Sequence, residues 1–338
     1  MFIAPFTRRT IEHSLHAGGA LVLAAREAGA ATFAASLVEG PAVLLGRHQR
    51  AARVVDLAEA ARLGIPVFRR RTAGTAAFAS GRTLVFTLAL PRVTTLFPDA
   101  SYRTLLNRNV RPFLKGLTAA GALSHYFGRE WVSSQRRPLL LLGFDVEPDG
   151  AVLIEAIAGF DHPFSLPPSL ASEDERSLDR FTGHPPAALS ELLPEGKTPE
   201  SVAQCLTDAI AARAPTARTE RPDLLAAPPA QDLTDAGSPA GDLSLLDPVP
   251  PSASLLPPVR IPIGWLERAA LPGSAPLWLG GDVLAPRWGL DRIAAAAAGI
   301  QDHGLNTTDF PLEGVSLPEL LGKAGPALDR ERGGPQPS

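Results

Sequence analysis

Cysteine, lysine and long apolar runs are scarce in this sequence of 338 residues. The single cysteine, Cys205, excludes an intrachain disulfide. The lysines are Lys115, Lys197 and Lys323, so few positions can supply an amine nucleophile or an ammonium counter-ion. No apolar stretch reaches the roughly 20 residues that a membrane-spanning helix needs, which argues against a membrane protein.

Charge and motif content exclude further classes of protein. The net charge is −3 and the isoelectric point is near 6.2, whereas proteins that bind nucleic acids usually carry a basic field, so no nucleic-acid partner is expected. We find no Walker loop, dinucleotide-binding glycine fingerprint, Gly-x-Ser-x-Gly elbow or zinc pattern, and predict no metal site. The first nine residues lack the charge-then-apolar order of a signal peptide, so a cytoplasmic location is expected.

Composition and length favour a soluble globular chain with two folded units. Apolar residues make up 45% and charged residues 20%, and 338 residues allow two domains. The first domain is predicted over residues 1–214. Residues 215–258 hold ten prolines and are predicted to form a disordered or semi-rigid linker, with an ordered loop as the alternative. Residues 259–338 are predicted to form a small second domain with a disordered tail.

Hydrophobic periodicity and turn residues predict mixed α and β structure, placing the chain in the α+β class. The clearest element is a hairpin, with strands at 139–146 and 151–157 joined by the turn Pro148-Asp149-Gly150. Pro112 is expected to kink or divide a helix near residues 102–120. Further helices are predicted at 18–29, 55–62, 201–212, 290–298 and 317–321, and further strands at 31–38, 42–45, 65–68, 83–90, 263–267 and 277–282.

A run of arginines and small residues lies between two predicted strands and reads Arg69-Arg70-Arg71-Thr72-Ala73-Gly74-Thr75-Ala76-Ala77-Phe78. Arginine offers a planar fork of donors that grips a carboxylate or phosphate at two points. Small residues let the backbone approach a ligand closely. The run therefore predicts an anion or acyl-ligand site in which Arg70 is the anchor, while Arg69 and Arg71 are interpreted as solvated.

The same run resembles the Arg-Arg-x-Ser/Thr-Gly-Gly-Gly-Ala-Val signature of the lipoate–protein ligase A family, within the biotin/lipoate protein ligase superfamily. Other segments follow in the family's order. They are 41–49 with Gly46-Arg47-His48-Gln49, Gly128-Arg129-Glu130, the hairpin at 139–157, 187–193, and a C-terminal unit with Gly264-Trp265 and Gly281-Asp282.

The resemblance implies a catalytic domain of mixed sheets with flanking helices, plus a small α+β accessory domain. It also implies activation of lipoate or a related acid by ATP and Mg, followed by acyl transfer to a lysine of a lipoyl or acyl carrier domain. Carried over by position, the ligand-binding residues are Arg70, Thr72, Gly74, Thr75, Ala76 and Arg129.

Several departures from the family pattern bear on activity. The family's lysine lies three residues before a glycine, and here Leu140 holds that position before Gly143. Arg137 is a possible substitute for the lysine if the alignment shifts.

Two of the three signature glycines are also replaced, by Ala73 and Thr75. Their side chains should narrow the space in which the backbone meets a ligand. Glu130 replaces an asparagine; it either holds a metal or a ribose hydroxyl, or is a solvated turn residue, and the second interpretation is favoured.

Without a cation near the acyl site, the repulsion between a carboxylate and a triphosphate is not offset. The leading hypothesis is therefore a ligase homologue without ordinary lipoyl transfer, which binds an acyl ligand or a carrier domain and needs no cofactor. The alternative is an active acyl-adenylate-forming ligase or acyltransferase that attaches lipoate, octanoate or another small acid to a carrier lysine, with ATP and Mg. A third hypothesis is a scaffold whose proline-rich segment recruits a partner. Cys205 and His48 are interpreted as structural.

Overall fold

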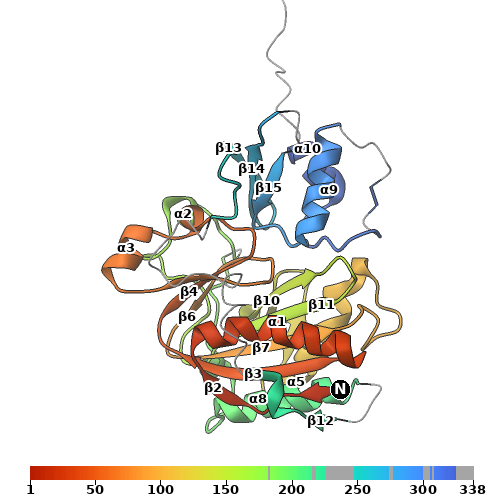
Figure 1. Ribbon diagram of the computed structural model, residues 1–338. Helices are drawn as coiled ribbons and strands as arrows, with labels where there is room; N and C mark the ends of the chain where they lie inside the picture. The colour runs from red at the N-terminus through yellow and green to blue at the C-terminus, as the bar shows by residue number, and fades with distance from the viewer. Residues whose placement is uncertain are drawn as a thin grey trace, which may run out of the picture.

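The computed structural model describes residues 1–181, 183–214, 218–225, 247–273, 277–299, 305–306 and 308–324. The interior of the predicted linker (226–246) and the predicted tail from residue 325 lie outside the described residues. A large mixed unit carries a smaller unit, made of β13–β15, α9 and α10, along one edge (Figure 1).

A large sheet forms the centre of the first unit. Its strand order is β12-β1-β3-β7-β11-β10-β9-β8, and β2 pairs with β3. The pairs from β3 through to β8 are antiparallel, whereas β1 and β2 run parallel to β3. The strands are β1 (Phe2–Ile3), β2 (Thr7–Arg9), β3 (Thr32–Glu39), β7 (Arg82–Leu90), β8 (Ser124–Tyr126), β9 (Trp131–Ser134), β10 (Arg137–Val146), β11 (Val152–Gly159) and β12 (Thr219–Glu220).

Helices cover both faces of this sheet. α5 (Arg111–Ala120) and α8 (Pro199–Ala211) pack on one face, where Phe113 and Leu206 join the main apolar core. α1 (Ile11–Ala28) lies on the other face and buries Leu21 against strand residues such as Ala34. Because strand side chains alternate between faces, Phe33 and Ala34 enter different cores. The layered arrangement confirms the predicted α+β class.

Several predicted elements are confirmed with shifted bounds. The hairpin is present as β10 and β11, paired antiparallel through Val146 and Val152. Pro112 does divide its helix, because α5 begins at Arg111 after η1 (Tyr102–Thr104) and α4 (Leu105–Asn109). α1 begins seven residues earlier than predicted, where the Thr10 side chain caps it by accepting from the His13 amide.

A second, three-stranded sheet carries the arginine run. β4 (Ala42–Leu45) pairs in parallel with β5 (Val67–Arg69) and antiparallel with β6 (Ala77–Ala79). The segment 70–76 is therefore the loop that joins the two outer strands. The short helices α2 (Ala51–Val54) and α3 (Leu57–Arg62) pack on this sheet, and α6 (Glu173–Arg176) contacts α2. A further short helix, α7 (Leu189–Leu192), adds Leu189 to the main core of the large sheet.

The smaller unit is an α+β body with its own apolar core. It comprises β13 (Ser254–Ile261), β14 (Gly264–Ala270), β15 (Trp278–Gly281), α9 (Arg287–Ala297) and α10 (Leu317–Ala324). Within the described residues, no helix combines the length and apolar character needed to cross a bilayer.

The structure corrects the predicted linker at both ends. β12 adds to the large sheet, and η2 (Pro222–Leu225) buries Leu224 and Leu225 against α1. At the other end, β13 begins at Ser254 and includes Pro257 and Pro258. The two prolines are tolerated because β13 is an edge strand with an irregularity between Leu256 and Val259, where no ladder amide is required.

Candidate functional site

Arg70 is an internal clamp of the loop between β5 and β6. Its side chain is buried, with 1% exposed, and its Nη1 donates to Thr72 Oγ1 at 3.0 Å. Its Nη2 donates to the carbonyl oxygen of Thr75 at 2.6 Å. Burial lowers the pKa of Arg70, and the carboxylate of Glu155 opposes that shift. The guanidinium thus holds the two ends of the loop together, and much of its donor capacity is used within the protein.

The loop lies directly on the hairpin strands. The amide of Ala73 donates to the carbonyl oxygen of Phe144 on β10 at 2.8 Å. A Cβ added at Gly143 would lie 2.6 Å from the Ala73 carbonyl oxygen and 2.6 Å from Arg70 Nη1. Thr72 Oγ1 donates to Glu155 on β11. The space between the loop and β10 is therefore filled by the protein's own atoms at this position.

Two glycines allow the closest backbone approach at the loop. Gly74 has a φ of +118°, and a Cβ added at Gly46 would lie 1.7 Å from the Gly74 carbonyl oxygen. A Cβ on Gly74 itself would lie 3.2 Å from the side chain of Leu284, which belongs to the smaller unit, and 3.3 Å from the Leu142 carbonyl oxygen. Leu284 thus covers the glycine that was predicted to meet ligand.

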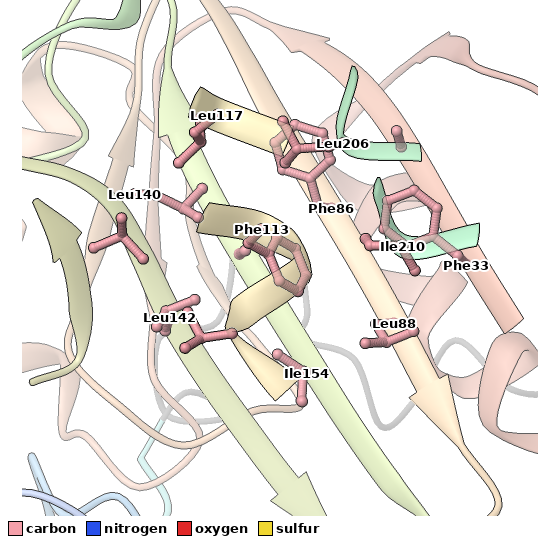
Figure 2. Packing of buried hydrophobic residues seen from close by; sticks show 14 of the residues in the cluster. Phe33, Phe86, Leu88, Phe113, Leu117, Leu140, Leu142, Ile154, Leu206 and Ile210 are labelled. Carbon is pink, nitrogen blue, oxygen red and sulfur yellow. The ribbon is translucent and has the colours of Figure 1, made fainter. Parts of the chain in front are cut away.

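Leu140 does not face this loop. Its side chain is fully buried in the main core with Phe113 and Leu117 of α5 (Figure 2). Leu142 belongs to the same core, whereas Gly143 contacts the arginine loop on the opposite face. Side chains alternate along a strand, so a cation at position 140 would enter an apolar core. Which position matches the family's lysine stays a prediction.

Arg137 lies at the start of β10, away from the loop. Its guanidinium pairs with Glu191 at 2.7 Å and donates to the Pro186 carbonyl oxygen at 3.0 Å. It is six residues before Gly143, which is about 20 Å along an extended strand. The structure therefore does not bring Arg137 to the arginine loop. Its guanidinium instead binds the segment from Pro186 to Glu191, which includes most of α7.

Arg129 lines a different pocket. Its guanidinium lies 5.7 Å from the ring centroid of Trp131, in a cavity of about 240 Å³ that Phe127 and Phe181 also line. Of the predicted ligand residues, the structure brings together the loop members Arg70, Thr72, Gly74, Thr75 and Ala76. It places Arg129 apart from them.

Glu130 is buried rather than solvated, which corrects the favoured sequence interpretation. Glu130 is 1% exposed, and the Leu142 amide donates to its backbone carbonyl oxygen, which ties the residue to β10. Burial raises the pKa of Glu130 to about 7, against the opposing effects of Arg180 and Arg129. Among the described residues, neither carboxylate oxygen has a hydrogen-bond partner. No cluster of three or more His, Cys, Asp or Glu suited to a metal ion occurs in the described part of the chain.

Asp145 and Arg47 form a partly buried ion pair beside the loop. Asp145 projects from β10, two residues beyond Gly143 and on the same face, and pairs with Arg47 of the β4–α2 connection. Burial raises the pKa of Asp145 to about 6, and Arg47 opposes that shift. Sequence reasoning missed Asp145, Glu155 and Leu284, because strand alternation and contacts between the two units decide which side chains meet the loop.

Comparison with known proteins finds a family model that matches part of the chain. The family described as "Lipoyl protein ligase A/B catalytic domain" matches residues 19–130, a range that includes the arginine loop. No curated protein sequence matches the chain.

Solved structures share the fold at low sequence identity. LipL1 of P. falciparum in complex with lipoate matches with a TM-score of 0.62 and 13% identity, over 84% of each chain. An archaeal bi-partite lipoate protein ligase from Thermoplasma acidophilum, described together with its E2 lipoyl domain, matches with a TM-score of 0.54 and 14% identity, over 69% of this chain and 91% of that one. A lipoate-protein ligase A bound with ATP matches with a TM-score of 0.51 and 13% identity, over 69% and 91% respectively. Residues 19–130 therefore match the model of the lipoyl protein ligase A/B catalytic domain, and the chain has the fold of the lipoate-protein ligases.

Proposed function

We propose that this protein is a lipoate–protein ligase homologue without ordinary ATP-dependent lipoyl transfer, and that it binds an acyl ligand or a carrier domain. The proposal rests on the absence of a lysine from the face of β10 that lies beside the arginine loop. That face presents Gly143 and Asp145, and none of the chain's three lysines lies on β10 or β11. Adenylation brings a carboxylate against a triphosphate, and a preorganised cation is the usual means of stabilising that charge.

The packing of the loop supports the same proposal. Arg70, the expected ligand anchor, bonds to Thr72 and to the Thr75 carbonyl group. Leu284 covers Gly74, and the Ala73 amide is bonded to β10. An acyl-adenylate at this position would have to displace these contacts.

A carrier domain is the partner that the relatives favour. The Thermoplasma acidophilum ligase is described with its E2 lipoyl domain, and the P. falciparum protein with lipoate. This chain shares their fold, so a lipoyl or acyl carrier domain and a small acyl acid are the ligands to test first. We also propose a cytoplasmic location, where such carriers would be met.

ATP–pyrophosphate exchange tests the loss of activity. The full chain is assayed with lipoate and with octanoate, in the presence of Mg and ATP, beside an active lipoate–protein ligase as the positive control. We expect exchange no faster than in a protein-free blank. Robust exchange with either acid would overturn the proposal. Calorimetric titration of an unmodified lipoyl domain into the full chain then tests carrier binding independently.

The alternative function is an active ligase or acyltransferase that uses an arginine where the family uses lysine, with ATP and Mg as cofactors. The position of two arginines beside β10 favours this alternative. Arg70 lies next to Gly143, and Arg47 forms an ion pair with Asp145, on the side of β10 that faces the loop. The solved ligase A structure with ATP shows that a protein of this fold holds the nucleotide. Exchange with an acid other than lipoate or octanoate would support this alternative.

A further inference from the structure

An exposed apolar row runs along the outer edge of the large sheet, beside β8. Leu123 and Phe127 flank the strand, and they are 64% and 72% exposed. His125 lies between them in the strand, and its ring stacks on Phe127 with 6.0 Å between the ring centroids. Alternate residues of a strand share one face, so the three side chains form a row, which we call the β8 ridge.

The outer edge of β8 is open to a further strand. Among the described strands, β8 ends the sheet and pairs with β9 alone. Strand residues direct their backbone groups alternately to either side, so some N–H and C=O groups of β8 face away from β9. Edge strands are usually protected by charged residues or proline, whereas the β8 ridge is apolar and aromatic. This edge therefore has the properties of a strand-addition site.

A pocket continues the surface beyond the β8 ridge. Phe127 lines the cavity of about 240 Å³ together with Arg129, Trp131, Arg136 and Phe181. Neither arginine forms an ion pair within the described residues, and Arg129 instead stacks on Trp131. No carboxylate belongs to the described lining of the pocket, which is therefore aromatic and cationic.

The carboxylates of this part of the fold leave the two arginines largely uncompensated. Glu130 is buried, and burial raises its pKa to about 7, so a large part of it is protonated near neutral pH. Glu191 pairs with Arg137 at 2.7 Å, and Asp179 accepts from the Gly183 amide at 2.9 Å. The pocket beside the β8 ridge therefore carries a surplus of positive charge.

Arg136 reaches this pocket from a strained turn. Gln135 and Arg136, between β9 and β10, have φ angles of +51° and +66°, in the left-handed region that favours glycine or asparagine. Backbone strain of this kind persists where the surrounding structure enforces it, and it is concentrated at functional sites. The turn thus holds a guanidinium beside the exposed aromatic row.

We propose that the edge of β8 binds an extended acidic segment of a partner protein by strand addition. The backbone of the segment would supply the missing strand, its apolar side chains would cover Leu123 and Phe127, and its carboxylates would pair with Arg129 and Arg136. An acidic segment fits this edge better than a second copy of the chain, because a second copy would present the same arginines. The proposal requires neither acyl transfer nor carrier binding, so it stands apart from the proposed function.

A preorganised peptide tests the edge. The probe is a fluorescein-labelled cyclic β-hairpin whose outer strand reads Glu-Thr-Val-Thr-Glu-Thr-Val, so that antiparallel pairing sets its valines opposite Leu123 and Phe127. We expect saturable binding to the full chain in fluorescence anisotropy. A hairpin with lysine in place of glutamate, and one with N-methylated amides in the outer strand, should each bind at least about tenfold more weakly. Equal binding of either control, or no binding of the acidic hairpin at about 1 mM, would overturn the proposal.

Substitutions locate the binding on the chain. Phe127→Ser shortens the β8 ridge and should weaken binding at least about tenfold, whereas Leu63→Ser, at an exposed leucine after α3, should bind like the wild type. Arg136→Gly removes a guanidinium where glycine suits the backbone, so the variant should fold normally and bind more weakly. Thermal melts check that each variant is folded. Unchanged affinity of folded Phe127→Ser would overturn the assignment to β8.

Sedimentation of the chain without peptide checks the competing occupant. We expect Phe127→Ser and the wild type to sediment alike. A wild-type dimer that Phe127→Ser dissociates would assign the edge to a second copy and would overturn the proposal.

Discussion

Gln49 donates a hydrogen bond from Nε2 to Oδ1 of Asp282 at 2.6 Å, and this bond joins the two units of the chain. The other oxygen of Asp282 accepts from the Trp265 amide at 2.7 Å and pairs with Arg180 at 3.2 Å. Burial works against the charge on Arg180, but Asp282 and Glu175 outweigh it and raise the pKa of that guanidinium. One buried carboxylate thus fixes the position from which Leu284 reaches Gly74.

Asp282→Ala should therefore destabilise the contact between the units. Arg180 would keep Glu175 but lose a buried partner, and Gln49 would be left with an unsatisfied amide. Removing one member of a buried ion pair typically costs about 3–5 kcal/mol. Chemical denaturation followed by tryptophan fluorescence measures the loss. As the control, Asp309→Ala removes a more exposed carboxylate of the same unit and should cost less than about 1 kcal/mol. Similar losses in both variants would contradict this role for Asp282.

Glu130 should make stability fall as pH rises. Its pKa is raised by burial from 4.5 to about 7, so between those values the folded protein keeps a proton that the unfolded chain releases. The free energy of unfolding therefore falls through this window, and above pH 7 the folded state carries the full cost of a buried charge, about 3 kcal/mol.

Glu130→Gln tests that dependence, because glutamine keeps the shape without the charge. We expect thermal melts of the variant and the wild type to differ little at pH 4.5, and the variant to melt several degrees higher at pH 8. The melting temperature of the variant should still fall somewhat as pH rises, since burial also raises the pKa of Glu313 to about 7. Parallel melting curves across the whole pH range would show that Glu130 does not contribute.

Arg70→Ala should destabilise the fold rather than remove a ligand contact alone. The change leaves Glu155 buried without its neighbouring cation and frees the Thr75 carbonyl group. We expect a loss of about 3–5 kcal/mol in urea denaturation. Arg129→Ala removes a half-buried guanidinium that stacks on Trp131, and should cost about 1 kcal/mol or less. An Arg70→Ala protein as stable as the wild type would instead favour a pure binding role.

Leu140→Lys should fail to create a ligase. The side chain at 140 packs under α5, so an ammonium there would be buried among Phe113, Leu117 and their neighbours. We expect severe destabilisation and no ATP–pyrophosphate exchange. Leu123→Lys, at a side chain that is 64% exposed, should change stability by no more than about 0.5 kcal/mol. A stable, folded Leu140→Lys protein with exchange activity would mean that the position faces the site after all.

Elements with a strong local signal were predictable from the sequence. The hairpin of β10 and β11 follows from two apolar strands around Pro148-Asp149-Gly150, and the helix division follows from the geometry of Pro112. The short strands β1, β8 and β9 carry too few residues for a periodic pattern, so they were missed. Proline density extended the predicted linker over Pro257 and Pro258, which the structure places in β13, because an edge strand tolerates proline.

The candidate site was predictable only as a segment of chain. Arg70, Thr72 and Gly74 do lie together, because a loop between adjacent strands keeps neighbouring residues close. Their roles differ from the expectation: Arg70 is buried and holds the loop, and Gly74 meets a leucine of another unit. Whether a side chain binds a ligand or the protein itself depends on contacts that sequence spacing does not contain.

By itself, the sequence determined the α+β class, the absence of lysine from the hairpin and the arginine-rich loop, because residue identity and local periodicity decide these features. Only the tertiary structure decided that Leu140 faces a core, that Glu130 is buried and that Leu284 covers Gly74. The physical reason is that strand alternation and the docking of one unit on another determine which groups lose water. Those contacts join residues that are distant in the sequence, such as Leu140 with Phe113 and Gly74 with Leu284.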